Sequence, residues 1–173
     1  MCVILYKPKG VDIPPMAIFD KMERLNHDGF GICTANKRIK TLDYERFKTA
    51  VQCVRKDEVA LIHFRLATNG SVCRRNCHPF YDVPTGTNFM HNGVLALPHD
   101  FISAGDITDS EWAFKTYLVP AIRDYGIYSG RFAREVENVI GSSRFAFLQG
   151  DKAALFGRFS PYLGCWYSNL RFL

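Results

Sequence analysis

The second residue of the chain, Cys2, has a position that permits nucleophilic chemistry. Removal of Met1 would make Cys2 the first residue and give it a free α-amino group. Because an α-amine titrates at roughly pH 7.7–8.0, it suits a general base at neutral pH. It can take the proton of the thiol on its own residue, so that no separate histidine is needed. Position alone favours the ordinary explanation, a small buried hydrophobic residue.

An arginine follows directly after an apolar run. Residues 59–64 predict a buried strand, and Arg65 stands at its end, three residues before Thr68. A cation at such a place is costly unless it meets an anion, and the guanidinium fork matches a carboxylate. Arg65 is therefore a candidate anchor for a substrate carboxylate. The ordinary explanation is a structural ion pair with one of the 17 acidic residues.

Two later segments carry groups that an amino-acid substrate would need. Asn92 and Gly93 place a side-chain amide beside an unhindered backbone N–H, and two such donors can form an oxyanion hole. Asp109 stands at a predicted helix start, where its carboxylate could bind an ammonium group. The ordinary explanations are a turn for Asn-Gly and a helix cap for Thr108 or Asp109.

In their order along the chain, these segments resemble one family, the class II glutamine amidotransferases, and most closely its small stand-alone members. The motifs are Met-Cys, His-x-Arg-x-x-Thr-x-Gly, Asn-x-His-Pro, His-Asn-Gly and Thr-Asp-Ser-Glu, and they cover residues 2 to about 115. The resemblance implies an α+β fold, the four-layer αββα sandwich of the Ntn hydrolases. Two antiparallel sheets pack face to face in that fold, and helices cover the outside.

The resemblance also implies roles for particular residues. Cys2 would attack the side-chain amide of glutamine, giving a γ-glutamyl thioester and ammonia, and water would then release glutamate. The histidines His63, His78 and His91 would be architectural, and neither a cofactor nor a metal is expected. The catalytic residues would be Cys2, Asn92 and Gly93. Among the substrate-binding residues, Arg65 would hold the α-carboxylate, Asp109 would hold the α-ammonium group and Thr68 would line the pocket. Asp28, in the glycine-containing segment 26–31, would be a supporting carboxylate.

Some features depart from the large members of the family. Leu66 and Asn69 stand where some members have an aromatic residue and a histidine, which puts the substrate preference in question. We expect residues 1–173 to form a single glutaminase-type domain without an acceptor domain, since 173 residues suit one domain. A separate synthase would then be the partner that receives ammonia. Two alternatives are a hydrolase of another γ-glutamyl or amide substrate, and a catalytically silent binding module of the same fold.

Composition and spacing argue against several other classes of protein, namely nucleic-acid-binding, secreted, membrane and metal-binding proteins. The net charge is +5, but the basic residues are scattered, so nucleic-acid binding is disfavoured. The apolar N-terminal run stops at Lys7, which is too early for a signal peptide or a membrane span. We therefore expect a cytoplasmic protein with reduced thiols and no membrane partner. The spacing of Cys73, Cys77 and His78 does not match common zinc or haem motifs.

The elements that must position these residues alternate between strands and helices. A long segment without a regular pattern, residues 67–87, is typical of a functional loop. Glycines in residues 26–31 predict a close approach of the backbone to another group. We expect strands at 3–6, 29–34, 39–42, 59–64, 88–91, 144–149, 153–156 and 165–172. We expect one helix that opens at Pro14-Pro15 and ends at 25, a second over 43–54, a third that starts at 108 and has a kink or break at Pro120, and a fourth over 132–140.

Overall fold

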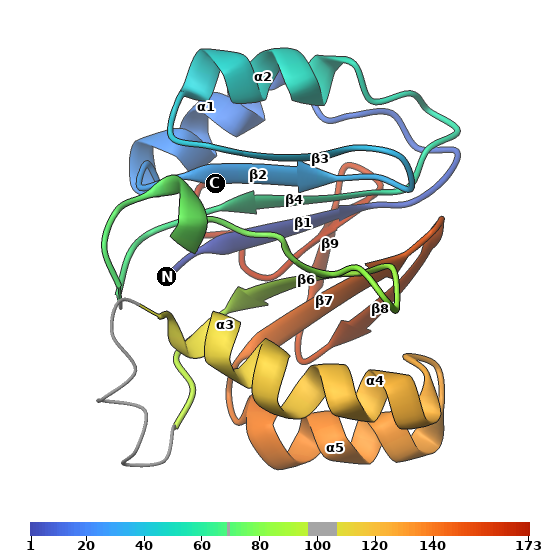
Figure 1. Cartoon of the computed structure of the whole chain (residues 1–173). Coiled ribbons are helices and arrows are strands. Elements are labelled where there is room, and N and C mark those ends of the chain that lie inside the picture. Colours follow the sequence, from blue (N-terminus) through green and yellow to red (C-terminus); the bar gives the residue numbers. More distant parts are fainter. Residues whose placement is uncertain (69, 97–106) are drawn as a thin grey trace.

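The chain folds into two antiparallel sheets that pack face to face between two layers of helices (Figure 1). The computed structural model describes residues 1–68, 70–96 and 107–173. In this part of the chain, one sheet has six strands in the order β3-β2-β4-β1-β10-β9 and the other has four in the order β5-β6-β7-β8. The strands are β1 (Val3–Lys7), β2 (Phe30–Cys33), β3 (Arg38–Thr41), β4 (Ala60–Phe64), β5 (Phe80–Asp82), β6 (Thr87–Asn92), β7 (Arg144–Gln149), β8 (Lys152–Phe156), β9 (Ser160–Tyr162) and β10 (Cys165–Tyr167).

Strand periodicity explains the layers, because successive side chains point to opposite faces of a sheet. In β1, Val3 and Leu5 face the helices α1 (Met16–Leu25) and α2 (Tyr44–Gln52), whereas Ile4 packs between the two sheets. In β7, Phe145 faces the opposite helical layer, while Ala146 packs against the inner faces. The apolar residues thus form three core layers, and the predicted four-layer α+β sandwich is confirmed.

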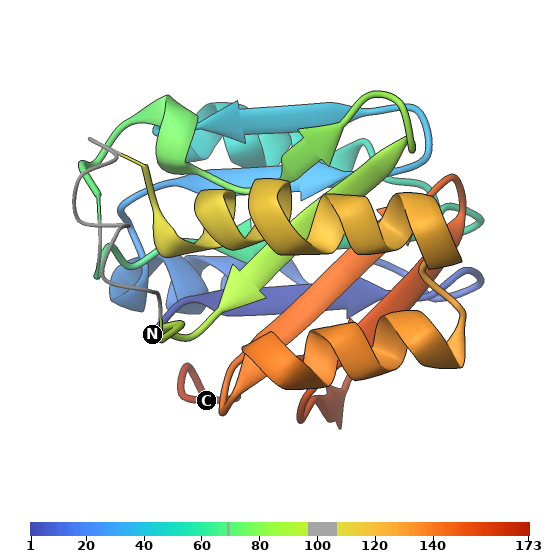
Figure 2. The same ribbon diagram turned by 60° about the horizontal axis from the view of Figure 1, so that its bottom comes forward.

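Helices cover the outer face of the second sheet (Figure 2). These are α3 (Asp109–Ala113), the π-helical turn η3 (Phe114–Leu118), α4 (Val119–Tyr125) and α5 (Gly130–Ile140). The hydroxyl of Thr108 caps α3 by accepting a hydrogen bond from the Glu111 amide at 3.1 Å. Because this cap fixes where α3 begins, it also fixes the position of the neighbouring Asp109.

The α-helical pattern is interrupted near Pro120, where a kink or break is expected: η3 precedes Pro120, which lies in the first turn of α4. Two other details differ from the sequence expectations. The irregular segment contains a short 3-10 turn, η1 (Arg74–Asn76), and the edge strand β5. The last strand, β10, ends at Tyr167 rather than continuing to residue 172. In the described part of the chain, no helix is long and apolar enough to cross a membrane.

Candidate active site

Cys2 lies directly before β1, at the end of the sandwich where β6 ends and α3 begins (Figure 1). Its Sγ lies 3.4 Å from both the amide nitrogen and the carbonyl oxygen of Leu66. Burial raises the pKa of the Cys2 thiol above its ordinary value; the Leu66 backbone, the N-terminal ammonium and Arg65 act in the opposite direction. While Met1 occupies the first position, the thiol is therefore mainly protonated at neutral pH.

Cys2 borders a cavity with a volume of only ≈ 20 Å³, which is enough for about one water molecule. Five of the seven predicted site residues line this cavity, whereas Asn92 and Asp28 are not among its lining residues. The residues that surround it come from the position directly before β1, the segment after β4, the long loop, the end of β6 and the start of α3. The lining residues are Cys2, Arg65, Leu66, Thr68, Asn76, His78, His91, Gly93, Thr108, Asp109 and Ser110.

Arg65 is buried in the wall of this cavity, with 3% of its surface exposed. Its guanidinium donates to the carbonyl oxygens of Ser71, at 2.9 Å, and Gly70, at 3.4 Å. The loop after β4 therefore holds the planar cation beside Cys2 through backbone contacts. The departure at Asn69 falls in the same loop, outside the described residues.

Asp109 is also buried, and its two carboxylate oxygens have different partners. One oxygen accepts from the Leu95 amide at 3.0 Å, and the other accepts from the Ser110 amide at 2.8 Å. The Ser110 hydroxyl also lies 2.7 Å from Nδ1 of His91, so a polar chain joins β6 to the start of α3. Burial lowers the pKa of His91 to about 4, which keeps this imidazole neutral.

Asn92 is connected to β1 through Ser168, a residue that the motifs do not include. Its Nδ2 donates to Oγ of Ser168 at 2.8 Å, and the same oxygen accepts the Ile4 amide of β1 at 2.8 Å. The next residue, Asn169, donates from Nδ2 to the carbonyl oxygen of Cys2 at 2.8 Å. Ser168 and Asn169 therefore hold both the backbone of Cys2 and the side chain of Asn92, the predicted oxyanion donor.

The sequence carries one signal for this pair of residues. Ser168 and Asn169 are consecutive polar residues in a segment that alternates as a strand from residue 165. Both residues follow the end of β10 at Tyr167. The Ser168 amide still donates to the Ile4 carbonyl at 2.9 Å, so this segment stays against β1.

Asp28 supports the loop rather than the cavity. Its carboxylate accepts a hydrogen bond from the Ala67 amide at 2.8 Å, two residues after Arg65. The glycines near it confirm the predicted close approach. A Cβ on Gly29 would lie 2.3 Å from Sγ of Cys77, and one on Gly31 would lie 1.7 Å from the His78 carbonyl oxygen.

Gly93 is constrained for a similar reason. Its φ is +148°, and a Cβ would lie 2.2 Å from the hydroxyl of Ser143. A second hollow, of ≈ 200 Å³, meets the first at Cys2, Leu66, Thr68 and Gly93 and continues past Met1. The described residues contain no group of three or more His, Cys, Asp or Glu side chains arranged to hold a metal ion.

Comparisons with known proteins agree with this geometry. Residues 48–148, more than half of the chain, match the sequence model of the class-II glutamine amidotransferases. Among solved structures, the chain is similar to the glutamine phosphoribosylpyrophosphate amidotransferase from B. subtilis, determined in complex with ADP and GMP. The TM-score is 0.59 at 17% sequence identity, and the match covers 96% of this chain.

The match covers only 41% of the B. subtilis chain, so the present chain spans about two fifths of that protein's length. At this identity, the similarity between the two structures establishes the fold. A search of curated proteins found no match. The family assignment rests on the sequence model, whose matched region runs from α2 to the end of β7 and includes the motifs around Arg65, Asn92 and Asp109. The chain therefore belongs to the class-II glutamine amidotransferases.

Proposed function

We propose that this chain hydrolyses the side-chain amide of glutamine, with Cys2 as the nucleophile. One observation carries the proposal: the Cys2 thiol shares a cavity with Arg65 and Asp109. A free amino acid has a carboxylate and an ammonium group, and these two buried side chains have the complementary charges. Thr68 would form part of the wall, and Gly93 and the second hydrogen of the Asn92 amide would supply the oxyanion donors.

The reaction follows from the chemistry of a thiol and an amide. The Cys2 thiolate adds to the amide carbon, and the carbonyl oxygen takes the negative charge. As the tetrahedral intermediate collapses, the C–N bond breaks, the nitrogen takes a proton and ammonia leaves, giving a γ-glutamyl thioester. Water then adds to the thioester, the C–S bond breaks, and glutamate and the thiol are released. The α-amine of Cys2 would carry the proton between these steps.

This mechanism requires that Met1 be removed. While Met1 is present, the nitrogen of Cys2 is an amide and cannot act as a base. Met1 also lines two hollows. Its loss would therefore both create the base and enlarge the space beside Cys2, which a glutamine needs because ≈ 20 Å³ accommodates only a water molecule.

We further propose that residues 1–173 act as a glutaminase-type domain that delivers ammonia to an acceptor on a separate protein. The match to the class-II glutamine amidotransferases supports the release of ammonia from glutamine. A cytoplasmic location would suit the six free cysteines, whose thiols must stay reduced if Cys2 is to react.

Intact-protein mass spectrometry tests the nucleophile. The protein is incubated with a glutamine analogue that carries an electrophile at the end of its side chain. We expect loss of Met1 and one covalent adduct, located on Cys2 by peptide mapping. Cys2→Ala should take up no label, whereas Cys53→Ala, which removes an exposed thiol, should be labelled as fully as the unmodified protein. Retention of Met1 in active protein, or equal labelling of Cys73, would refute the mechanism.

Steady-state kinetics tests the carboxylate anchor. Arg65→Ala should lower kcat/KM for glutamine by about ten- to a hundredfold, since a charge-assisted hydrogen bond is worth roughly 1.5–3 kcal/mol. Arg46→Ala removes an exposed arginine from α2 and serves as the control. The anchor role is wrong if both variants keep the activity of the unmodified protein.

The second hollow favours one alternative substrate class. It meets the first cavity at Cys2 and provides ≈ 200 Å³, and Asp109 lines the first cavity but not this hollow. A γ-glutamyl compound with a leaving group larger than ammonia could occupy both spaces. Comparing glutamine with γ-glutamyl-p-nitroanilide as substrates distinguishes the two substrate classes. A higher kcat/KM for the anilide supports the alternative, and a strong preference for glutamine contradicts it.

A further inference from the structure

A groove separate from both hollows near Cys2 lies behind the wall of the Cys2 cavity. This groove has a volume of ≈ 280 Å³ and lies between β3, the segment from η1 to β5, and the helical run α3–η3. Successive residues of the wall face different sides. Asn76, His78 and Ser110 line the Cys2 cavity, whereas the groove is lined by Arg38, Lys40, Arg75, Pro79, Phe80, Tyr81, Glu111, Phe114 and Lys115.

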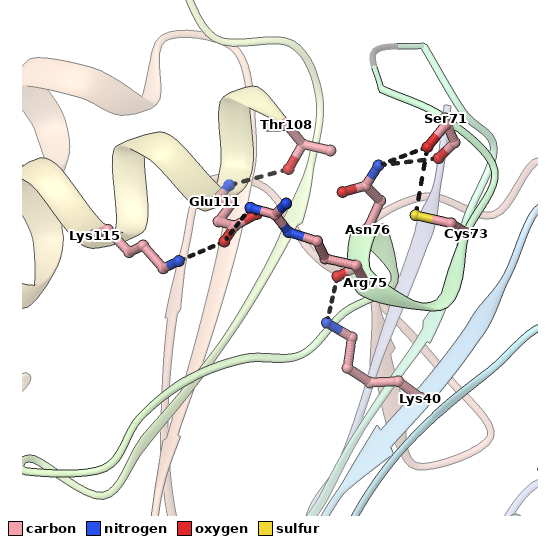
Figure 3. Close-up of polar contacts among 8 residues, drawn as sticks. All are labelled: Lys40, Ser71, Cys73, Arg75, Asn76, Thr108, Glu111 and Lys115. Carbon is pink, nitrogen blue, oxygen red and sulfur yellow. Dashed lines mark hydrogen bonds and ion pairs between the residues drawn. The ribbon is translucent and has the colours of Figure 1, made fainter. Parts of the chain in front are cut away.

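The groove has four cationic side chains and one carboxylate among its lining residues. Figure 3 shows Lys40, Arg75 and Lys115 approaching from three separate elements. Arg75 lies 3.5 Å from Glu111, and Lys115 forms an i,i+4 ion pair with the same carboxylate at 2.5 Å. Glu111, with 5% of its side chain exposed, is therefore shared by two cations.

The other two cations bond neutral groups. Nζ of Lys40 donates to the Arg75 carbonyl oxygen at 2.6 Å, and Nε of Arg38 donates to Oδ1 of Asn88 at 2.6 Å. Arg38 also stacks on the ring of Tyr81, with 3.1 Å from Cζ to the centroid. Neither cation forms an ion pair with a carboxylate within the described part of the chain, so the groove has excess positive charge.

Lys40 is partly buried in the wall of the groove. Burial lowers the pKa of its ammonium to about 8, and Arg74 adds to the effect. Glu111 and the thiols of Cys77 and Cys73 act in the opposite direction but do not restore the ordinary value. An anion in the groove would raise this pKa again, because an opposite charge nearby favours the protonated amine.

We propose that this groove binds a phosphate group, either free or as part of a phosphorylated metabolite. A tetrahedral dianion can accept hydrogen bonds from donors that arrive from several directions, as Lys40, Arg75 and Lys115 do. The four cations and one carboxylate give the groove a net charge of +3, and a dianion would offset more of this charge than a single carboxylate would. The Glu111 carboxylate competes with the bound anion for Arg75 and Lys115.

Isothermal titration of the full chain with inorganic phosphate tests the site. We expect saturable binding at one site per chain. Lys40→Gln and Lys115→Gln should each weaken it about tenfold, the loss of one charge-assisted hydrogen bond. Lys21→Gln, an exposed lysine on α1, should leave the affinity unchanged, and Glu111→Gln should strengthen it. Lys115 is 66% exposed, so its variant keeps the test valid if Lys40→Gln does not fold.

Two further arms identify the source of the phosphate and the role of Lys40. If glucose 6-phosphate binds more tightly than inorganic phosphate, the ligand is an ester; if it binds more weakly, the ligand is the free anion. Sulfate, which stays dianionic, should bind less tightly as the pH rises through about 8, since Lys40 then loses its proton.

The proposal fails if no saturable binding occurs at concentrations on the order of 10 mM, if Lys21→Gln weakens binding as much as Lys40→Gln, or if Glu111→Gln reduces the affinity. None of these measurements involves glutamine, so their failure would leave the proposed hydrolysis untouched.

Discussion

Ser168 connects two parts of the candidate site that lie far apart in the sequence. Its hydroxyl oxygen accepts hydrogen bonds from the backbone of β1, at Ile4, and from the side chain of Asn92. The strand that follows Cys2 and the predicted oxyanion donor therefore share one buried atom. Because the Ser168 contact uses only one hydrogen of the Asn92 amide, the other would bond the oxyanion in the proposed mechanism.

We predict that Ser168→Ala lowers kcat for glutamine about tenfold and changes KM by less than about twofold. A misplaced oxyanion donor weakens binding of the transition state more than binding of the substrate. Kinetics at saturating and limiting glutamine measure the two constants. Ser129→Ala removes another hydroxyl, the cap of α5, and should cost about 1 kcal/mol of stability without changing kcat. An equal fall of activity in both variants would assign Ser168 a purely structural role.

At the scale of elements, the site depends on how closely the long loop approaches β2. Gly31 in β2 lies against the backbone of His78, which lines the Cys2 cavity. The absence of a side chain at this position lets the loop pack directly on the strand. The segment after β4 is held in turn by Asp28, which accepts the Ala67 amide. Backbone contacts thus set the positions of Arg65 and His78.

Gly31→Ala should destabilise the fold by about 3 kcal/mol. The new methyl group would overlap a backbone carbonyl oxygen that cannot turn away, so strand and loop must separate. Urea unfolding followed by circular dichroism measures the change. Gly130→Ala is the matched control, since nothing lies within 4 Å of a Cβ there and the helix tolerates alanine. It should change stability by no more than about 0.5 kcal/mol. A Gly31→Ala variant as stable as Gly130→Ala would refute the close approach.

At the scale of the whole molecule, three buried histidines lie where the two sheets, the long loop and α3 meet. Nε2 of His63, on β4, lies 3.0 Å from the carbonyl oxygen of His91, on β6 in the other sheet. The rings of His63 and His78 are 4.2 Å apart. Burial lowers the pKa of His63 to about 3 and of His91 to about 4, and holds that of His78 well below its ordinary value.

These pKa values predict a steep acid dependence of stability. All three folded-state pKa values lie below 6.5, so the contribution of these neutral rings is fully present above pH 6.5. This stabilising contribution is lost as the pH falls from 6.5 towards 4, because the histidines of the unfolded chain become protonated in this range while those of the folded chain stay neutral. With three protons, the free energy of unfolding should fall by up to about 4 kcal/mol per pH unit in this range.

Urea unfolding between pH 7 and pH 5 measures this slope. His63→Gln keeps a donor for the His91 carbonyl and should reduce the slope by about one third, since one titrating group is lost. His27→Gln, at an exposed site, should leave the slope as in the unmodified protein. A slope insensitive to His63→Gln would mean that other groups cause the acid dependence.

The sequence alone determined most local elements and led to a candidate nucleophile, Cys2. Alternation and helix caps are local signals, so Asp43 and Thr108 marked helix starts correctly. The motifs led to the family and to the four-layer fold. They also indicated the candidate cysteine, because its chemistry depends on its position beside the N-terminus. The thioester mechanism and the roles of the individual residues remain predictions.

Only the tertiary structure decided which side chains meet. Arg75 and Asn76 are neighbours in the sequence, yet they face two different cavities. Asn92 and Ser168 are 76 residues apart, yet they share a hydrogen bond. Local patterns show which residues are buried, but they do not show which buried surface each one faces. That depends on the register of the strands and on how two sheets pack, and both arise from contacts between distant segments.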